Sequence, residues 1–79
     1  MANKNTYKVT LMQAGVLATF RLNDEEYKQL KIYAKGDRFY NFSAFAWADY
    51  ELSRSKMGRF HSIFDYHKGE FYIFEVEEI

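Results

Sequence analysis

His61 and His67 are the two imidazoles of this 79-residue chain, so they are the first candidates for a chemical role. They lie six residues apart, and the chain has no Cys and no His-x-x-x-His pair on a predicted helix, so this spacing does not match a zinc site. His61 and Asp65 would share one face of a predicted strand, a pairing that could orient an imidazole. Coincidence explains this pairing better than catalysis, and we predict no metal ligand and no catalytic residue.

Carboxylates and serines give no stronger indication of catalysis. Asp65 and Glu70 flank a predicted turn, where paired carboxylates are normally solvated, and nothing in the sequence indicates the apolar pocket that acid–base catalysis would need. The serines lie in no nucleophile elbow, and the four scattered glycines form no phosphate-binding loop. A chain this short also offers little material from which to build a cleft. We therefore predict a protein that is not an enzyme and uses no cofactor.

Length and composition predict a single domain spanning residues 1–79. A hydrophobic content of 48% with 28% charged residues is typical of a soluble globular chain. No apolar run approaches the roughly 18–20 residues of a membrane span, and residues 1–6 lack the apolar stretch of a signal peptide. The absence of Cys is typical of a reducing compartment. These features predict a cytoplasmic protein with no membrane contact.

Aromatic residues are the most informative part of the composition. The chain has sixteen of them, and twelve lie at or after Phe39. A domain of this size buries only about 60–65% of its unfolded surface, so some aromatic side chains should remain exposed. Exposed aromatics beside positive charge are typical of contact surfaces. We predict a partner-binding surface formed by Lys31, Lys35, Arg38, Tyr40, Phe42, Trp47 and Tyr50.

Charge is balanced overall but not along the chain. The net charge is zero, which argues against an electrostatic footprint for nucleic acid. Residues 1–59 carry ten Lys and Arg against six Asp and Glu (+4), whereas residues 60–79 carry one Lys against five Asp and Glu (−4). This asymmetry indicates either a solvated acidic end or a basic side that steers the protein toward an acidic partner.

Residues 7–12 show the first strand pattern, in which apolar and polar side chains alternate. A second alternating segment spans residues 16–22. The short link between the two segments contains Gly15, which can adopt a positive φ. This arrangement predicts a β-hairpin.

Two helices are predicted after the hairpin. Asn23 and Glu26 match a capping box, and Gly36 suits the position just beyond the end of the first helix. Ser43 offers the N-cap of a second helix, and Gly58 offers its C-terminal stop. Residues 36–42, between the helices, could form a loop or a short strand.

The second predicted helix is apolar on two sides. Phe45, Ala48 and Leu52 form one stripe, which we expect to face the sheet. Trp47 and Tyr50 lie on another side. A helix of this kind is either sandwiched between other elements or bound to a partner.

The last twenty residues predict a second hairpin, with strands at residues 60–66 and 70–76. The run Phe71–Phe74 is apolar on both faces, which is typical of an interior strand. The predicted order is therefore ββααββ. This order describes an α+β fold, with an antiparallel sheet of two β-hairpins and two helices packed on one face.

Residues 18–52 also carry a family resemblance. The segment 19–30, with Ala34 and then Ser43 opening a helix, looks like the strand-helix-helix register of ribbon-helix-helix DNA-binding proteins. In that family two subunits pair their strands, and alternate outward side chains read the major groove. The resemblance implies a dimeric DNA-binding regulator whose readers would be Leu17, Thr19 and Arg21.

Two other functions remain open from the residues alone. Aromatic faces beside Lys and Arg could stack on unpaired bases, which would make the protein a single-strand binder. The neutral net charge and the acidic last segment favour a protein partner instead. We therefore predict a small protein-binding regulator or inhibitor, of the kind that phages and other mobile elements encode. The surplus of large apolar residues also predicts a homodimer.

Overall fold

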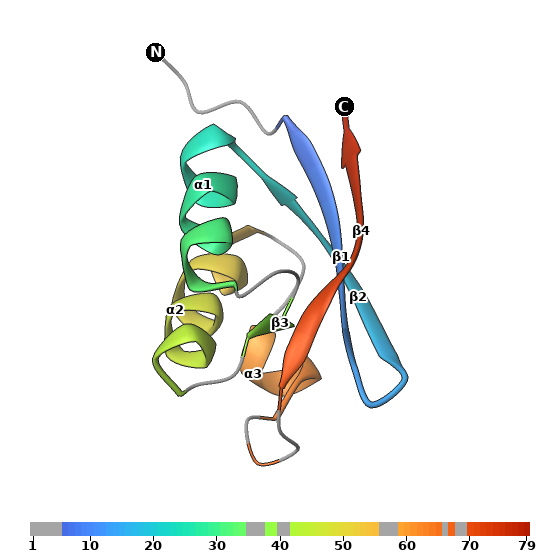
Figure 1. Cartoon of the computed structure of the whole chain (residues 1–79), viewed down its shortest axis with the longest axis vertical. Coiled ribbons are helices and arrows are strands. Elements are labelled where there is room, and N and C mark those ends of the chain that lie inside the picture. The colour runs from blue at the N-terminus through green and yellow to red at the C-terminus, as the bar shows by residue number, and fades with distance from the viewer. Residues whose placement is uncertain (1–5, 35–37, 40–41, 56–58, 66, 68–69) are drawn as a thin grey trace.

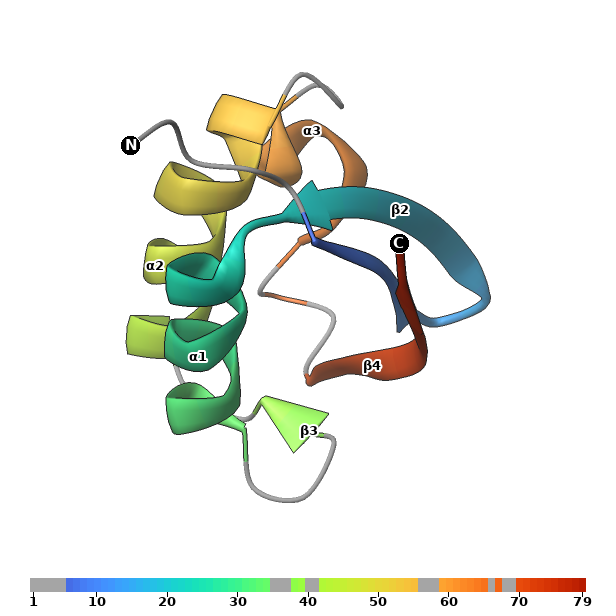
Figure 2. The same ribbon diagram turned by 90° about the horizontal axis from the view of Figure 1, so that it is seen from above.

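The structure, a computed structural model, describes residues 6–34, 38–39, 42–55, 59–65, 67 and 70–79. It is an α+β fold, in which an antiparallel sheet carries its helices along one face (Figures 1 and 2). The elements in chain order are β1 (Tyr7–Gln13), β2 (Val16–Leu22), α1 (Asp24–Tyr33), β3 (Arg38–Phe39), α2 (Phe42–Leu52), the 3-10 helix η1 (Ser53–Ser55), α3 (Phe60–Ile63) and β4 (Phe71–Glu78).

The first strand is the centre of the sheet, whose strand order is β2-β1-β4-β3. β1 pairs antiparallel with β2 on one side and with β4 on the other. β3 adds only two residues beside the start of β4. The register between β1 and β4 shifts where Thr10 pairs with Glu75 and Leu11 pairs with Ile73, which leaves Phe74 as the additional residue of a bulge.

The first hairpin confirms the prediction from alternation. Ala14 and Gly15 form its turn, and both have a positive φ (50° and 85°), as a two-residue type I′ turn requires. Across the strands, the hydroxyl oxygens of Thr10 and Thr19 lie 3.0 Å apart. The hairpin therefore has the register that its hydrophobic pattern demands.

The capping box of α1 is also confirmed. The side-chain oxygen of Asn23 accepts from the backbone N–H of Glu26 (2.8 Å), and the Glu26 carboxylate accepts from the backbone N–H of Asn23 (2.9 Å). The helix ends at Tyr33, and Ala34 is its C-cap. The predicted stop at Gly36 lies outside the described residues.

The second helix begins one residue earlier than predicted. It starts at Phe42, so Ser43 is an exposed residue of the first turn and not the N-cap. At its other end the chain tightens into η1, and the predicted stop at Gly58 lies outside the described residues.

The predicted second hairpin and the ββααββ order are wrong, because residues 60–63 form α3 and, among the described residues after Arg59, only β4 joins the sheet. Phe60 and Phe64 are four residues apart, so one helical turn brings both to the same side. Arg59, the N-cap, makes no side-chain cap bond; instead the carboxylate of Asp49 on α2 accepts from the backbone N–H of His61 (2.6 Å). A tertiary contact thus satisfies a helix-start donor that needs a partner.

A cluster of phenylalanines fills the space between the sheet and the helices. The ring centroid of Phe60 lies 4.9 Å from that of Phe45, 4.8 Å from that of Phe64 and 5.0 Å from that of Phe71. The predicted stripe of α2 faces this cluster, since Phe45, Ala48 and Leu52 are all buried. The predicted burial of this stripe is therefore confirmed.

A buried amide links the end of β1 to the chain that follows α3. The side-chain nitrogen of Gln13 donates to the backbone carbonyl of Asp65 (2.8 Å), and its side-chain oxygen accepts from the backbone N–H of Asp65 (2.7 Å). Both polar atoms of a side chain that is only 2% exposed are therefore satisfied.

Candidate protein-binding surface

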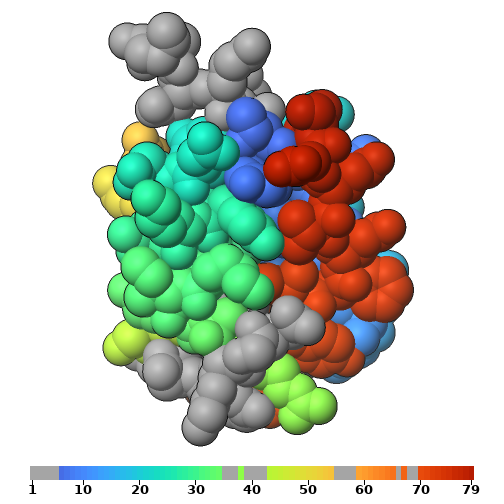
Figure 3. Space-filling model, turned by 45° about the horizontal axis from the view of Figure 1, so that its top comes forward, coloured from blue at the N-terminus to red at the C-terminus, as the bar shows by residue number. Residues whose placement is uncertain are grey.

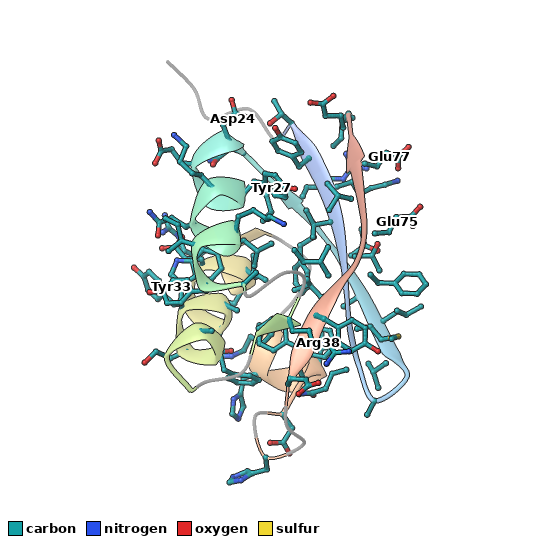
Figure 4. The ribbon with its side chains drawn as sticks, viewed as in Figure 1. Asp24, Tyr27, Tyr33, Arg38, Glu75 and Glu77 are labelled. Carbon is teal, nitrogen blue, oxygen red and sulfur yellow. The ribbon has the colours of Figure 1, made fainter. Side chains whose placement is uncertain are left out.

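Trp47 and Tyr50 lie off the buried stripe of α2, but they are not equally exposed, since Trp47 packs against the edge of the core. The Trp47 ring is half-buried and stacks on Tyr33 of α1, with centroids 5.5 Å apart. The Tyr50 side chain is 65% exposed. Figure 4 shows Tyr33 where α1 lies beside α2. Trp47 therefore helps to join the two helices, whereas Tyr50 projects to solvent.

Arg54 extends this surface beyond the end of α2. Its guanidinium carbon lies 5.6 Å from the centroid of the Tyr50 ring, within the range of a cation–π contact. A nitrogen of the same guanidinium lies 3.6 Å from the Glu51 carboxylate. We call Tyr33, Trp47, Tyr50 and Arg54 the aromatic ridge. Ile32, next to Tyr33 in the chain, is 66% exposed.

Helical spacing explains how the ridge forms. Trp47 and Tyr50 are three residues apart, and Arg54 follows Tyr50 by four, so all three lie on one side of a continuous helical segment. The opposite side of α2 is anchored in the core. The ridge therefore has a rigid backing, which lowers the entropy cost of binding.

The four predicted site residues whose side chains the structure describes, Lys31, Arg38, Trp47 and Tyr50, do not lie on one surface. Lys31 is exposed, but it lines a hollow on another side of α1. Arg38 lies at the edge of the sheet, where its guanidinium approaches the Glu70 carboxylate (3.8 Å). Lys35, Tyr40 and the side chain of Phe42 lie outside what the structure describes.

Two ridge residues were absent from the predicted site. Arg54 follows Tyr50 by four residues, and this helical spacing predicts that the two side chains lie on the same side of the helix. Tyr33 was unpredictable as a member, because its contact with Trp47 joins two helices that are distant in the chain.

The hollow that Lys31 lines lies between α1 and the start of β1 and has a volume of about 430 Å³. Figure 3 shows this side of the molecule, where α1 (teal to green) meets β1 (blue) and β4 (red). The rings of Tyr7 and Tyr27 stack here at 4.2 Å, and the hydroxyl of Thr6 donates to the Asp24 carboxylate (2.8 Å). Lys28 completes the lining, so carboxylate and ammonium groups both face the space.

The surroundings of Tyr7 in this hollow shift the pKa of its phenol. Partial burial raises the pKa of its phenol above 10.0, and the nearby carboxylates of Asp24 and Glu78 and the Tyr27 phenol raise it further. The phenol is therefore protonated at neutral pH. It can donate a hydrogen bond, but it is not a base.

The two histidines do not form a chemical site with Asp65. The His61 side chain belongs to α3, where the ring packs edge-on against Phe45 at 5.9 Å. The Asp65 carboxylate instead accepts from the backbone N–H of His67 (2.9 Å). The predicted strand face shared by His61 and Asp65 is therefore wrong. Among the described residues, no group of three His, Asp or Glu side chains could hold a metal ion.

The three positions suggested as base readers share the face of the sheet opposite the helices. Leu17, Thr19 and Arg21 alternate along β2 with side chains that turn toward the core. β2 pairs with β1 of its own chain, whereas a ribbon-helix-helix protein pairs this strand between subunits. Glu75 and Glu77 point outward from the same face, as Figure 4 shows, and would repel phosphates.

Comparisons of the chain with protein-family models, with curated proteins and with solved structures find no match. None of the helices in the described ranges is long and apolar enough to cross a membrane.

Proposed function

We propose that this protein is a non-enzymatic binding module that docks on another protein through the aromatic ridge. The observation that carries the proposal is the solvent-exposed Tyr50, which lies between the Arg54 guanidinium and the half-buried Trp47. Trp, Tyr and Arg dominate the residues that contribute most to protein–protein binding energy. A regulator or inhibitor of a cytoplasmic partner is the role that this surface suits.

The ridge is a better candidate than the hollow beside α1. The hollow is open to solvent and places carboxylate and ammonium groups together, so it selects no charge class of ligand. The ridge combines large apolar area with one cation, and its side chains are held by neighbours. Such pre-organised aromatic groups bind protein surfaces at low entropy cost.

A photo-crosslinking experiment tests the proposal. A benzophenone amino acid replaces Tyr50 in one version of the protein and Phe74, on the sheet, in another. We expect nuclease-resistant adducts with host proteins, as distinct from adducts between copies of this chain, from position 50 only. Unlabelled wild-type protein should compete for these adducts. The unlabelled double variant Tyr50→Ala with Arg54→Ala should need a concentration roughly thirtyfold or more higher to compete equally well, which corresponds to a loss of about 2 kcal/mol in binding free energy. Ile32→Ser, beside the ridge, is a comparison variant that reports how far the contact extends.

Competition that survives the double variant, or adducts that vanish with nuclease, would contradict the proposal. Thermal melts of each variant separate loss of binding from loss of fold.

Direct titration with random duplex and single-stranded DNA tests the nucleic-acid alternatives. We expect no affinity beyond the non-specific range of about 10⁻⁴–10⁻⁶ M at physiological salt. Submicromolar binding that is lost in Arg21→Ala would instead support a DNA-binding regulator.

A further inference from the structure

The face of the sheet turned away from the helices carries apolar side chains that none of the described residues covers. Alternation from buried Val9, Leu11 and Ile73 turns the intervening side chains outward. Leu17 is 52% exposed and Phe74 is 55% exposed. We call the outward side chains of β1, β2 and β4 the open sheet face; its members are Lys8, Thr10, Met12, Leu17, Thr19, Arg21, Tyr72, Phe74, Glu75 and Glu77.

Strand register sorts the open sheet face into three layers that cross the strands. Each layer contains one residue from β2, one from β1 and one from β4. The first layer is apolar, the second contains two threonines and a glutamate, and the third is charged. In that order the layers are Leu17, Met12 and Tyr72; Thr19, Thr10 and Glu75; and Arg21, Lys8 and Glu77. Phe74, at the bulge, lies between the first and second layers.

Within the charged layer, the positive groups lie on one side and the negative group on the other. Arg21 is on β2, and Glu77 is on β4, two strands away. Lys8 on β1 lies between them, with its ammonium 3.6 Å from the Glu77 carboxylate. The layer therefore has a positive end and a negative end, and these two ends are complementary to those of its own image when that image is turned around. Lys8, at the centre, would lie opposite the partner's Lys8, and its charge is balanced by Glu77 of its own chain.

We propose that the open sheet face binds a second copy of this chain, in a two-fold symmetric pair of sheets. The two-fold axis would run parallel to β1 and between the sheets. This rotation places β2 of one copy over β4 of the other, while each layer stays opposite its own equivalent. Arg21 then faces the partner's Glu77, and Glu77 faces the partner's Arg21. Leu17 faces the partner's Tyr72 and Phe74.

The layers exclude the alternative two-fold arrangement, with its axis perpendicular to the strands. That rotation would place the apolar layer of one copy against the charged layer of the other. Charged groups would then lose water without gaining a partner, which is costly. The parallel arrangement also suits the aligned packing of two sheets, whose strand directions differ by about 30°.

The size of the face sets the expected strength of the pair. Three strands about 4.8 Å apart, with seven residues that rise by about 3.3 Å each in β1, span a footprint of about 14 Å by 23 Å. Stable interfaces bury roughly 800 Å² on each partner, which is more than this face provides. We therefore expect a dimer with a dissociation constant in the micromolar range. Sedimentation equilibrium from low micromolar to millimolar concentration covers it.

Charge reversal tests the arrangement itself. Arg21→Glu places two carboxylates opposite each other, and Glu77→Arg places two guanidinium groups opposite each other, so each variant should self-associate more than about tenfold more weakly. An equimolar mixture of the two variants should form a heterodimer, because each unlike pair is restored. The double variant, with both reversals in one chain, should recover self-association. Arg21 and Glu77 are exposed, and melts of the variants check that the fold is intact.

Matched apolar variants complete the test. Leu17→Ser with Phe74→Ser should abolish the dimer, whereas Ile32→Ser, at an apolar position of α1 that is even more exposed, should leave it unchanged. Arg54→Glu, a charge reversal on the aromatic ridge, should also leave the dimer unchanged. Failure of this proposal is thus distinguishable from failure of the ridge.

Three results would overturn the proposal. The first is a wild-type chain that remains monomeric at millimolar concentration. The second is a dimer that is indifferent to the sheet variants, as pairing through the edge of β2 or through the ridge would give. The third is a mixture of the two charge-reversed variants that fails to associate although the wild type does.

Discussion

The two faces of the sheet come from the same strands, yet they have opposite surroundings. On β4, Phe71 is 1% exposed and packs into the phenylalanine cluster, while Phe74, three residues later, is 55% exposed. On β2, Phe20 and Leu22 are fully buried, while Leu17 is half exposed. The inner face holds the molecule together. The outer face retains apolar side chains that contribute little to the stability of a single chain.

An apolar pattern on both faces of a strand does not by itself predict burial on both faces. The helices cover only one face of this sheet, as Figure 2 shows. A chain this short has too few helical residues for a second covering layer. Unpaired apolar residues on a sheet are therefore best interpreted as a surface for association.

The largest expected effect separates the two faces on one strand. Phe71→Ala should lower the free energy of unfolding by about 3–5 kcal/mol, because it leaves a cavity among packed rings. Phe74→Ala should change it by less than about 0.5 kcal/mol at a protein concentration where the chain is monomeric. Urea denaturation followed by circular dichroism measures both. Similar losses from the two variants would remove the distinction between the faces.

An intermediate effect is expected at the polar end of the inner face. Gln13→Ala removes two hydrogen bonds and leaves the backbone N–H and carbonyl of Asp65 without their buried partner. The free energy of unfolding should fall by about 1–3 kcal/mol. Gln29→Ala, at an exposed position of α1, is the matched control and should be nearly neutral. Equal melting temperatures for the two variants would show that the link does not stabilise the fold.

The smallest effect concerns pH at the hollow. The raised pKa of Tyr7 means that the folded state favours the protonated phenol. Its contribution to stability is therefore fully present below pH 10.0, and it declines as the pH rises through the raised pKa. Asp24→Asn should lower the pKa of Tyr7, and Glu25→Gln should not. Nuclear magnetic resonance of ring-labelled tyrosine, assigned with Tyr7→Phe, follows the titration. An unchanged Tyr7 pKa in Asp24→Asn would contradict this origin of the shift.

Part of the candidate surface was predictable from local spacing. Trp47 and Tyr50 lie off the buried stripe of α2 by helical geometry alone, and Arg54 follows at the next turn. The placement of Lys31 and Arg38 was not predictable. Both are basic and close in sequence to the aromatic segment, but Lys31 faces the hollow and Arg38 joins the sheet edge. Sequence proximity does not indicate which side of a folded layer a side chain will occupy.

The sequence by itself determined the elements whose signals are local. Alternation with Gly15 specified the first hairpin, and Asn23 with Glu26 specified the start of α1, because these interactions join residues that are neighbours in the chain. Only the tertiary structure decided whether residues 60–63 form a strand or a helix. Their short apolar pattern suits a strand or a helical turn, and the Asp49 carboxylate with the packing of Phe60 selected the helix. Contacts between distant segments also decided which sheet face stayed open, since burial depends on what packs against a strand as well as on its own residues.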